Sequence, residues 1–350
     1  MLVKARCTHG PAVPFTTTRI ERRELGPRDV LINIAFAGIC HSDIDHARQL
    51  RGGGKTRYPL VPGHEIAGVV AAVGSEVTRF RVGDPAGVGN MVGSCRDCPQ
   101  CAAGMEQYCS GQRVLTYNSL DHDGQPTYGG YSEKIVVDEH FVVRIPAGMP
   151  LERAAPLFCA GITLYSPLRR WKAGPGKRVA IIGFGGLGHV GVQIARAMDA
   201  HTTVLELASG KREDALRLGA DDFRLTTDPA TFKLLESSFD LIISTVPVNL
   251  DLDKVLALLA VDGTLVTLAV PAQPLSLSAV SLLRNRRSIA GTLSGGMDET
   301  QEMIDFCAAH DIGAQVEVIA ADQIDEAYER LLAGDVRYRF VIDIATLTND

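Results

Sequence analysis

Four cysteines form the most distinctive chemical pattern in the sequence. Cys95, Cys98, Cys101 and Cys109 are spaced C-x2-C-x2-C-x7-C in one loop that is rich in Gly, Pro and polar residues. Four thiolates this close in the chain can surround one Zn2+ tetrahedrally, each sulfur about 2.3 Å from the metal. Two disulfides are the alternative for the same residues. The spacing predicts a closed, structural zinc lobe over residues 90–112.

A second set of ligand-type residues is dispersed along the chain. It consists of Cys40, the neighbours His64 and Glu65, and Cys159. Only three of these are strong zinc ligands, so one coordination position stays available for a reactant, and this distinguishes catalytic from structural zinc sites. The sequence therefore predicts two zinc ions per chain, one of them catalytic.

The composition is that of a globular protein large enough for two domains. Of its 350 residues, 46% are hydrophobic and 22% are charged, which is typical of soluble chains of this size. The formal net charge is -6, with no long run of Lys or Arg. This charge disfavours nucleic acid or an anionic membrane as a partner. No run of about 18 apolar residues occurs, so we expect no transmembrane span.

The cysteine content bears on the cellular compartment. The first residues, MLVKARCTHG, lack the apolar stretch of a signal peptide. In a long chain without a secretion signal, clustered cysteines more often bind metal than form disulfides. We therefore expect a cytoplasmic protein.

Three segments of different pattern must position these residues. Residues 1–154 are rich in Gly, Pro and short β-type runs such as 66–73, which predicts an all-β, partly barrel-like domain that carries the cysteine lobe. Over 155–293, strands alternate with helices, which indicates a parallel sheet covered by helices on both faces. We expect 294–350, a helix followed by a strand, to return to the first domain.

A glycine turn follows the first strand of the α/β segment and opens its first helix. It contains G-x-G-x-x-G and comprises Gly183, Gly185, Gly186, Leu187 and Gly188. The glycines permit a tight turn, close approach of the backbone to a pyrophosphate, and packing of helix on strand. The helix N-terminus also favours phosphates. This context predicts a Rossmann domain that binds a dinucleotide.

The residue that ends the next strand bears on the choice of dinucleotide. Glu206 lies 21 residues beyond Gly185, where a carboxylate accepts hydrogen bonds from the adenosine ribose. A carboxylate there also repels a 2′-phosphate. Lys211 and Arg212 follow it and either pair with such a phosphate or form the solvated first turn of a helix. We predict NAD rather than NADP.

Several motifs occur together in a recognisable order. Residues 63–77 read G-H-E-x2-G-x5-G-x2-V and match the zinc alcohol dehydrogenase signature at every defined position. G-I-C-H-S-D at 38–43 precedes it; the cysteine lobe, Y-G-G-Y at 128–131, C-A-G-I-T at 159–163 and the glycine turn follow. The chain thus resembles the medium-chain dehydrogenase/reductase superfamily, specifically its cinnamyl alcohol dehydrogenase branch. The resemblance implies a GroES-like catalytic domain joined to a Rossmann cofactor domain.

The resemblance also implies a role for each matching residue. Cys40, His64 and Cys159 would hold the catalytic zinc, and Glu65 would be the carboxylate that can transiently approach it. Asp43 would hydrogen-bond His64 and fix its tautomer.

Three further residues would serve the reaction itself. Ser42 would hydrogen-bond the reacting oxygen and pass its proton outward. Thr163 would lie against the nicotinamide, and His41 near the pyrophosphate. In this scheme zinc polarises a carbonyl, and C4 of the nicotinamide delivers hydride to its carbon.

The sequence departs from the resembled branch at three places. Where many members carry a proton-relaying histidine, this chain has Asp45 followed by His46, so the relay uses Asp45, uses His46, or involves no side chain. The stretch 49–55 lacks the tryptophan that lines the branch's substrate pocket, so we expect an altered pocket wall. Glu206 replaces the serines that suit NADP.

We therefore predict a zinc-dependent oxidoreductase that interconverts a primary alcohol and its aldehyde with NAD(P)(H), in the direction of aldehyde reduction. A reductase of C=C or C=N bonds on the same fold is one alternative, and a non-catalytic redox sensor that binds zinc and nucleotide is another. The expected partners are a small alcohol or aldehyde and, by family resemblance, a second copy of the chain in a homodimer. We expect neither nucleic acid nor a membrane as a partner.

Overall fold

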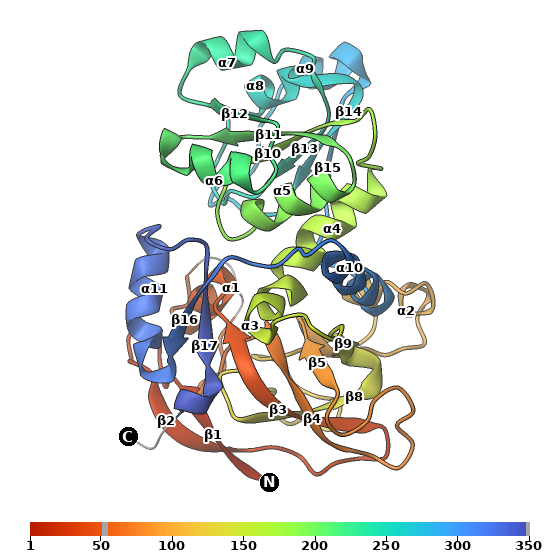
Figure 1. Cartoon of the computed structure of the whole chain (residues 1–350), viewed down its shortest axis with the longest axis vertical. Helices are drawn as coiled ribbons and strands as arrows, with labels where there is room; N and C mark the ends of the chain where they lie inside the picture. The colour runs from red at the N-terminus through yellow and green to blue at the C-terminus, as the bar shows by residue number, and fades with distance from the viewer. Residues whose placement is uncertain (51–54, 348–350) are drawn as a thin grey trace. The chain divides into compact units, whose positions relative to one another are not determined.

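A computed structural model describes residues 1–50 and 55–347, which form two compact units (Figure 1). The first unit comprises Met1–Ile162 and Gly295–Asp350, and the second comprises Thr163–Ser294. The sequence pattern places the boundaries after residues 154 and 293. Helix α4 (Ala160–Arg170) continues through the first boundary, so neither a turn nor a change of composition marks that point in the sequence.

A seven-stranded sheet forms the centre of the first unit. Its strands follow the order β16-β17-β3-β4-β5-β9, and β8 also pairs with β3. Strand β3 (Asp29–Gly38) buries apolar residues on both faces, with Val30 and Ile32 on one face and Leu31 on the other, as expected of a central strand. Strand β17 (Arg339–Asp343) pairs with it in antiparallel register. The C-terminal segment therefore completes the sheet that the N-terminal residues begin.

The other strands and helices of the first unit either complete this sheet or lie around it. Its other strands are β1 (Leu2–Cys7), β2 (Thr16–Glu21), β4 (Ile66–Val73), β5 (Pro85–Val88), β6 (Met91–Gly93), β7 (Val114–Leu115), β8 (Lys134–Asp138), β9 (Val143–Arg144) and β16 (Val316–Ala320). Its helices are α1 (His41–Ala47), α2 (Pro99–Ala102), α3 (Leu151–Ala154), α10 (Met297–Ala309) and α11 (Ile324–Leu332). The four-cysteine loop lies between β6 and β7, which pair with each other.

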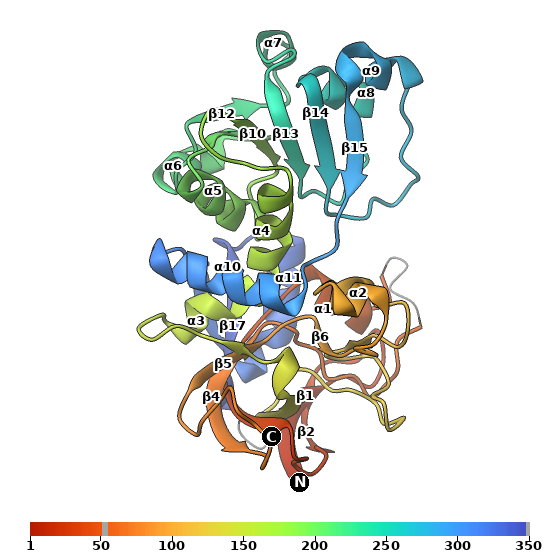
Figure 2. The ribbon, with the colours of Figure 1, turned by 90° about the vertical axis from the view of Figure 1, so that its right-hand side faces the viewer.

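The second unit is built on a six-stranded parallel sheet in the order β12-β11-β10-β13-β14-β15. Its strands are β10 (Arg178–Ile182), β11 (His201–Glu206), β12 (Asp222–Leu225), β13 (Phe239–Ser244), β14 (Leu259–Thr267) and β15 (Ser288–Gly291). Its helices after α4 are α5 (Gly188–Ala197), α6 (Arg212–Arg217), α7 (Pro229–Leu234), α8 (Leu252–Ala257) and α9 (Ala279–Leu283). In Figure 2, α5 and α6 cover one face of the sheet, and α8 and α9 cover the other. This order is the doubly wound Rossmann arrangement.

The fold class predicted from the sequence is confirmed, and two edge strands show why some strands give no clear pattern. Strand β12 buries only Phe223, and β16 buries only Ile319. Both strands lie at the edge of their sheets. Because an edge strand is partly exposed, it can contain polar residues, and these two strands lack the continuous apolar run that marks a buried strand. Within the described residues, no helix is long and apolar enough to cross a bilayer.

Candidate active site

The dispersed ligand set converges in the first unit. Cys40 is the N-cap of α1, His64 and Glu65 directly precede β4, and Cys159 directly precedes α4. One ligand atom from each of these four residues lies within 4.8 Å of the other three. Three of the four are buried and Cys159 is partly so. The chain therefore brings together, from three separate segments, the donor set that the sequence predicts for catalytic zinc.

The two thiols of this set fit a tetrahedral zinc ion. The Sγ atoms of Cys40 and Cys159 are 3.9 Å apart, and two sulfurs bound tetrahedrally at about 2.3 Å would be about 3.8 Å apart. The hydrogen bond between these thiols lowers the pKa of Cys40 well below its ordinary value and raises that of Cys159. One thiolate is thus already favoured, and metal binding would release the proton of the other.

Asp43 is placed to orient His64, the predicted histidine ligand. Its Oδ1 lies 3.3 Å from Nδ1 of His64, and its carboxylate accepts hydrogen bonds from the backbone N–H groups of Cys40, at 2.8 Å, and Gly63, at 3.1 Å. Because Nδ1–H of His64 faces this carboxylate, the lone pair of Nε2 is the one that can coordinate a metal. The tautomer implied by the family resemblance therefore has a geometric basis here.

Two buried tyrosines extend this arrangement away from the metal ligands. Tyr131 Oη donates to Oδ2 of Asp43 at 3.3 Å, and Tyr328 Oη donates to Tyr131 Oη at 3.4 Å. Both tyrosine side chains are almost wholly buried. The carboxylate that orients His64 is therefore itself fixed from three sides, which limits the freedom of the ligand.

Arg339 is a site residue that the sequence does not reveal. Its guanidinium forms an ion pair with Glu65, and both side chains are buried. Burial raises the pKa of Glu65 to about 7, against the opposing effect of Arg339. Gly38 allows the carboxylate this position, because a Cβ there would overlap Glu65 Oε2. The one signal that the sequence offers is a basic residue at the start of β17, directly before the apolar residues 340–342.

The four-cysteine lobe also has a metal-binding geometry. Sγ–Sγ distances are 3.4 Å for Cys98 and Cys101 and 3.4 Å for Cys95 and Cys109, and all four sulfurs lie within 4.8 Å of one another. The backbone N–H of Cys101 lowers the pKa of Cys98 to about 5. All eight cysteines of the chain are free thiols, so the alternative of two disulfides is not what the structure shows.

Residues near the predicted proton relay occupy helix α1. Ser42 Oγ lies 3.8 Å from Cys40 Sγ, and His41 Nε2 lies 3.9 Å from Asp45 Oδ1. His46 turns to another partner: its Nδ1 lies 2.9 Å from Nδ2 of Asn118. Asn118 was not among the residues that the sequence suggested.

Asn118 fixes which ring nitrogen of His46 carries the proton. Oδ1 of Asn118 accepts a hydrogen bond from the backbone N–H of Arg57 at 2.8 Å, so its amide NH2 must face His46. Nδ1 of His46 is then the acceptor, and the proton resides on Nε2. The His46 ring also lies edge-on to Tyr117, whose ring is 5.7 Å from that of His64.

The glycine turn of the second unit has the space that a pyrophosphate needs. A Cβ added to Gly183 or Gly188 would overlap protein atoms, and Gly183 has a φ of +89°. A Cβ added to Gly185 would meet nothing within 4 Å. Internal packing therefore accounts for Gly183 and Gly188, whereas Gly185 leaves open the surface that the dinucleotide fingerprint assigns to phosphate. Gly186 and Leu187 lie between it and the helix.

The side chains around the ribose position are engaged with one another. Glu206 accepts hydrogen bonds from the backbone N–H groups of Phe184, at 2.9 Å, and Leu207, at 2.8 Å. Lys211 Nζ lies 3.7 Å from Glu206 Oε2. Arg212 donates to the carbonyl of Phe223 at 3.1 Å and lies over its ring. The carboxylate is thus held at the glycine turn, while Arg212 is held against β12.

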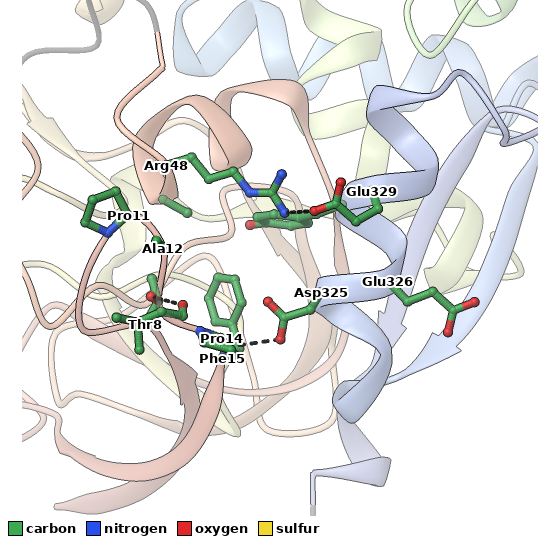
Figure 3. A pocket seen from close by; sticks show the side chains of 12 residues that line it. Thr8, Pro11, Ala12, Pro14, Phe15, Arg48, Asp325, Glu326 and Glu329 are labelled. Carbon is green, nitrogen blue, oxygen red and sulfur yellow. Dashed lines mark hydrogen bonds and ion pairs between the residues drawn. The ribbon is translucent and has the colours of Figure 1, made fainter.

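A cavity of about 550 Å³ lies elsewhere in the first unit, between the segment 8–15 and helix α11 (Figure 3). Arg48 and Glu329 form an ion pair at 2.5 Å across it. Oδ2 of Asp325 accepts from the backbone N–H of Phe15 at 3.0 Å. None of the predicted metal ligands lines this cavity among the described residues. The expected change in the pocket wall falls on residues 49–55, of which 51–54 lie outside the described residues, and that expectation stays a prediction.

Comparison with known families gives two matches, one within the first unit and one that covers most of the second unit and extends through helix α10. Residues 26–147 match the family model of the alcohol dehydrogenase GroES-like domain. Residues 186–309 match the family model of the zinc-binding dehydrogenase. The first match contains all the predicted metal ligands except Cys159, and the second begins within the glycine turn.

Individual relatives are similar over almost the whole chain. NADP-dependent alcohol dehydrogenase C 1 of Mycolicibacterium smegmatis is 57% identical over 99% of each chain. A cinnamyl alcohol dehydrogenase structure from Sorghum bicolor has a TM-score of 0.95 and 40% identity, covering 100% of this chain and 99% of its own. A CAD structure from Helicobacter pylori complexed with NADP(H) has a TM-score of 0.92 and 41% identity over 99% of each chain.

Proposed function

The chain belongs to the zinc-binding alcohol dehydrogenase family, and on this premise we propose that it interconverts primary alcohols and aldehydes with a nicotinamide cofactor, chiefly as an aldehyde reductase. The observation that carries the proposal is the open ligand set: Cys40, His64 and Cys159 converge while Glu65 is engaged by Arg339. Three strong ligands leave one position for an oxygen of the substrate. The direct test is aldehyde-dependent oxidation of reduced cofactor, measured over a panel of aldehydes.

The residues divide the work of the reaction among themselves. Zn2+, when bound, supplies Lewis-acid polarisation of a carbonyl, and the reduced nicotinamide supplies hydride. Cys40, His64 and Cys159 would hold the metal, and Asp43 would keep His64 in the coordinating tautomer. Ser42, two residues after the N-cap Cys40, would hydrogen-bond the substrate oxygen and move its proton outward. His41 and Thr163 would contact the cofactor, as the family resemblance implies.

The alternatives lose support on the same evidence. A reductase of C=C or C=N bonds does not require the complete set of Cys40, His64, Cys159 and Ser42, all of which are present here. A non-catalytic sensor would have no use for an open coordination position. The named relatives are alcohol dehydrogenases and cinnamyl alcohol dehydrogenases.

For the proton relay, we propose Asp45 rather than His46. A second proton on His46 would have to enter at Nδ1, where the amide N–H of Asn118 already points. Burial also lowers the pKa of His46. His46 is therefore a poor proton carrier and instead supports Tyr117. Asp45, on the same helix as Ser42 and beside His41, keeps an acceptor at the relay position.

Asp45→Ala is expected to lower kcat by roughly ten-fold or more, because a positioned proton carrier contributes at least this much. His46→Ala should change kcat by less than about three-fold. Formate, which can stand in for the lost carboxylate, should restore part of the rate of the first variant and none of the second. Steady-state kinetics across pH would check this pair, and a larger loss in the histidine variant would refute the assignment.

For the cofactor, we propose that NADH is preferred over NADPH. The carboxylate of Glu206 ends β11 and is held at the glycine turn, where it would oppose a 2′-phosphate. The guanidinium of Arg212 donates a hydrogen bond to the carbonyl of Phe223 in β12. The ammonium group of Lys211 lies 3.7 Å from the carboxylate of Glu206, which partly neutralises its charge. The proposal runs against the names of the similar proteins, which include NADP-dependent enzymes and a structure complexed with NADP(H).

Glu206→Ser should raise kcat/KM for NADPH relative to NADH by roughly ten-fold or more, since it removes a like charge and releases Lys211. Glu213→Ser is the matched control, because it removes an exposed carboxylate on the neighbouring helix α6 and should leave the ratio unchanged. Kinetics with both cofactors would measure this effect. Equal kcat/KM values for the two cofactors in the unmodified enzyme would rule out the selective role of Glu206.

The predicted homodimer and the cytoplasmic location stay predictions. Support for the dimer comes from β15, which is an edge strand of the parallel sheet. Exposed apolar side chains lie close by in sequence, including Val280, Leu283 and Leu293. An edge strand beside exposed apolar residues is a surface that a second copy can cover.

A further inference from the structure

The four-cysteine lobe contains a buried carboxylate that does not face its sulfurs. Glu106 begins the short helix η1 (Glu106–Tyr108), between the third and fourth cysteines, and is 3% exposed. Its backbone carbonyl accepts a hydrogen bond from the N–H of Cys109 at 3.0 Å. Its Oε1 lies 2.8 Å from Nε2 of His140, and its Oε2 accepts from the backbone N–H of Met297 at 3.1 Å. Glu106 therefore connects the fourth cysteine to a distant helix.

That helix has no N-terminal cap of its own. Met297 is the first residue of α10, and its N-cap is Gly296, which offers no side-chain acceptor. The first N–H groups of a helix have no partner within the helix, and an acidic group at this end also interacts favourably with the helix dipole. Glu106 supplies both from outside the helix. Gly296 leaves room for it, because a Cβ there would crowd Glu106 Oε2 and overlap the Gly104 carbonyl.

Helix α10 starts where the chain re-enters the first unit. The second unit ends at Ser294, and Gly295 is the first residue of the return. A Cβ on Gly295 would overlap Ile162, the last residue before the chain leaves the first unit. The outgoing and returning segments thus lie in contact, directly before the helix that Glu106 caps.

We propose that Glu106 is a positioning residue that couples the metal-binding lobe to this crossing segment, residues 295–297. Metal held by the cysteines fixes Cys109 and η1, η1 fixes Glu106, and Glu106 fixes the start of α10. Without metal, the lobe would no longer hold Glu106 in place, and the start of α10 at residues 295–297 would become more mobile. In this proposal the lobe stabilises the start of α10 as well as its own fold. The proposal does not depend on the reaction assigned to the other metal site.

Hydrogen exchange of the zinc-loaded full chain tests the coupling. Glu106→Ala should speed exchange of the amides of residues 295–300 by roughly ten-fold, because the N-terminal cap of α10 is lost. Glu106→Gln, whose amide oxygen can still accept from Met297, should stay within about three-fold of the unmodified chain. Glu302→Gln is the matched control: it removes an exposed charge from the same helix beyond its first turn, and it should leave exchange at residues 295–300 unchanged. All variants should retain both zinc ions.

Combining variants separates coupling from simple loss of the cap. Cys109→Ser should also speed exchange at 295–300, but it should add little in the Glu106→Ala background, since both changes break one chain of contacts. Unchanged exchange in Glu106→Ala, or fully additive effects of the two substitutions, would overturn the proposal. Should Cys109→Ser not fold, removal of the lobe zinc by a chelator, in the unmodified chain and in Glu106→Ala, replaces it as the second perturbation with the same two outcomes.

Discussion

His64→Ala is expected to lower kcat/KM for an aldehyde by roughly 1,000-fold or more, about 4 kcal/mol of transition-state stabilisation. His64 is the single nitrogen donor of the open ligand set, and it is buried and oriented by Asp43. Without it, two thiols and an engaged carboxylate remain, which is too few strong ligands to hold zinc firmly. Metal analysis of the purified variant should show one zinc per chain instead of two.

The control for this variant is His122→Ala, because His122 is an exposed histidine of the same unit outside both ligand sets. It should retain both zinc ions and near-normal kcat/KM. Less than a ten-fold loss in His64→Ala with full metal content would mean that the open site is not where the reaction occurs.

Arg339→Met should destabilise the fold by about 3–5 kcal/mol, because it leaves the buried carboxylate of Glu65 without its counter-ion. The effect should depend on pH. Burial already raises the pKa of Glu65 to about 7, despite Arg339, from an ordinary value of 4.5. Removing Arg339 raises this pKa further. A group with a raised folded pKa favours the native state most at low pH, and that advantage is lost as pH rises through the folded pKa. The variant should therefore be weakest above pH 7.

Thermal or denaturant unfolding at several pH values would measure this effect. The double variant Glu65→Leu/Arg339→Met removes both buried charges and should recover most of the lost stability, because apolar pairs often replace buried ion pairs at little cost. A single variant as stable as the unmodified chain at pH 8 would show that Glu65 does not depend on Arg339.

The parts of the site that the sequence predicts are those with local spacing or a distinctive residue type. The cysteine lobe, His64 with Glu65, and the glycine turn belong to this class. Arg339 and Asn118 do not, because they act on residues 274 and 72 positions away in the chain. Nothing in the local sequence marks such partners; only the pairing of β17 with β3 and the loop before β8 brings them to the site.

The fold was predictable to a similar extent and for similar reasons. The parallel sheet follows from apolar runs such as Arg178–Ile182, which coincides with β10. The boundary between the first and second units cannot be predicted in this way, because helix α4 continues across it. Likewise, nothing in the local sequence shows that Arg212 donates to the carbonyl of Phe223. The sequence shows which motifs can bind metal or cofactor. The residues that set the charge and orientation of their side chains are brought close only by the tertiary structure.

The most direct measurement is the absorbance of reduced nicotinamide while the enzyme turns over an aldehyde, before and after its exchangeable zinc is removed and restored. We expect aldehyde-dependent oxidation of NADH that disappears with one zinc, while the other stays in the cysteine lobe, and returns when zinc is added back. Oxidation that continues at full rate without that zinc would contradict zinc-dependent interconversion of aldehyde and alcohol. So would a chain holding both zinc ions that oxidises neither NADH nor NADPH with any aldehyde.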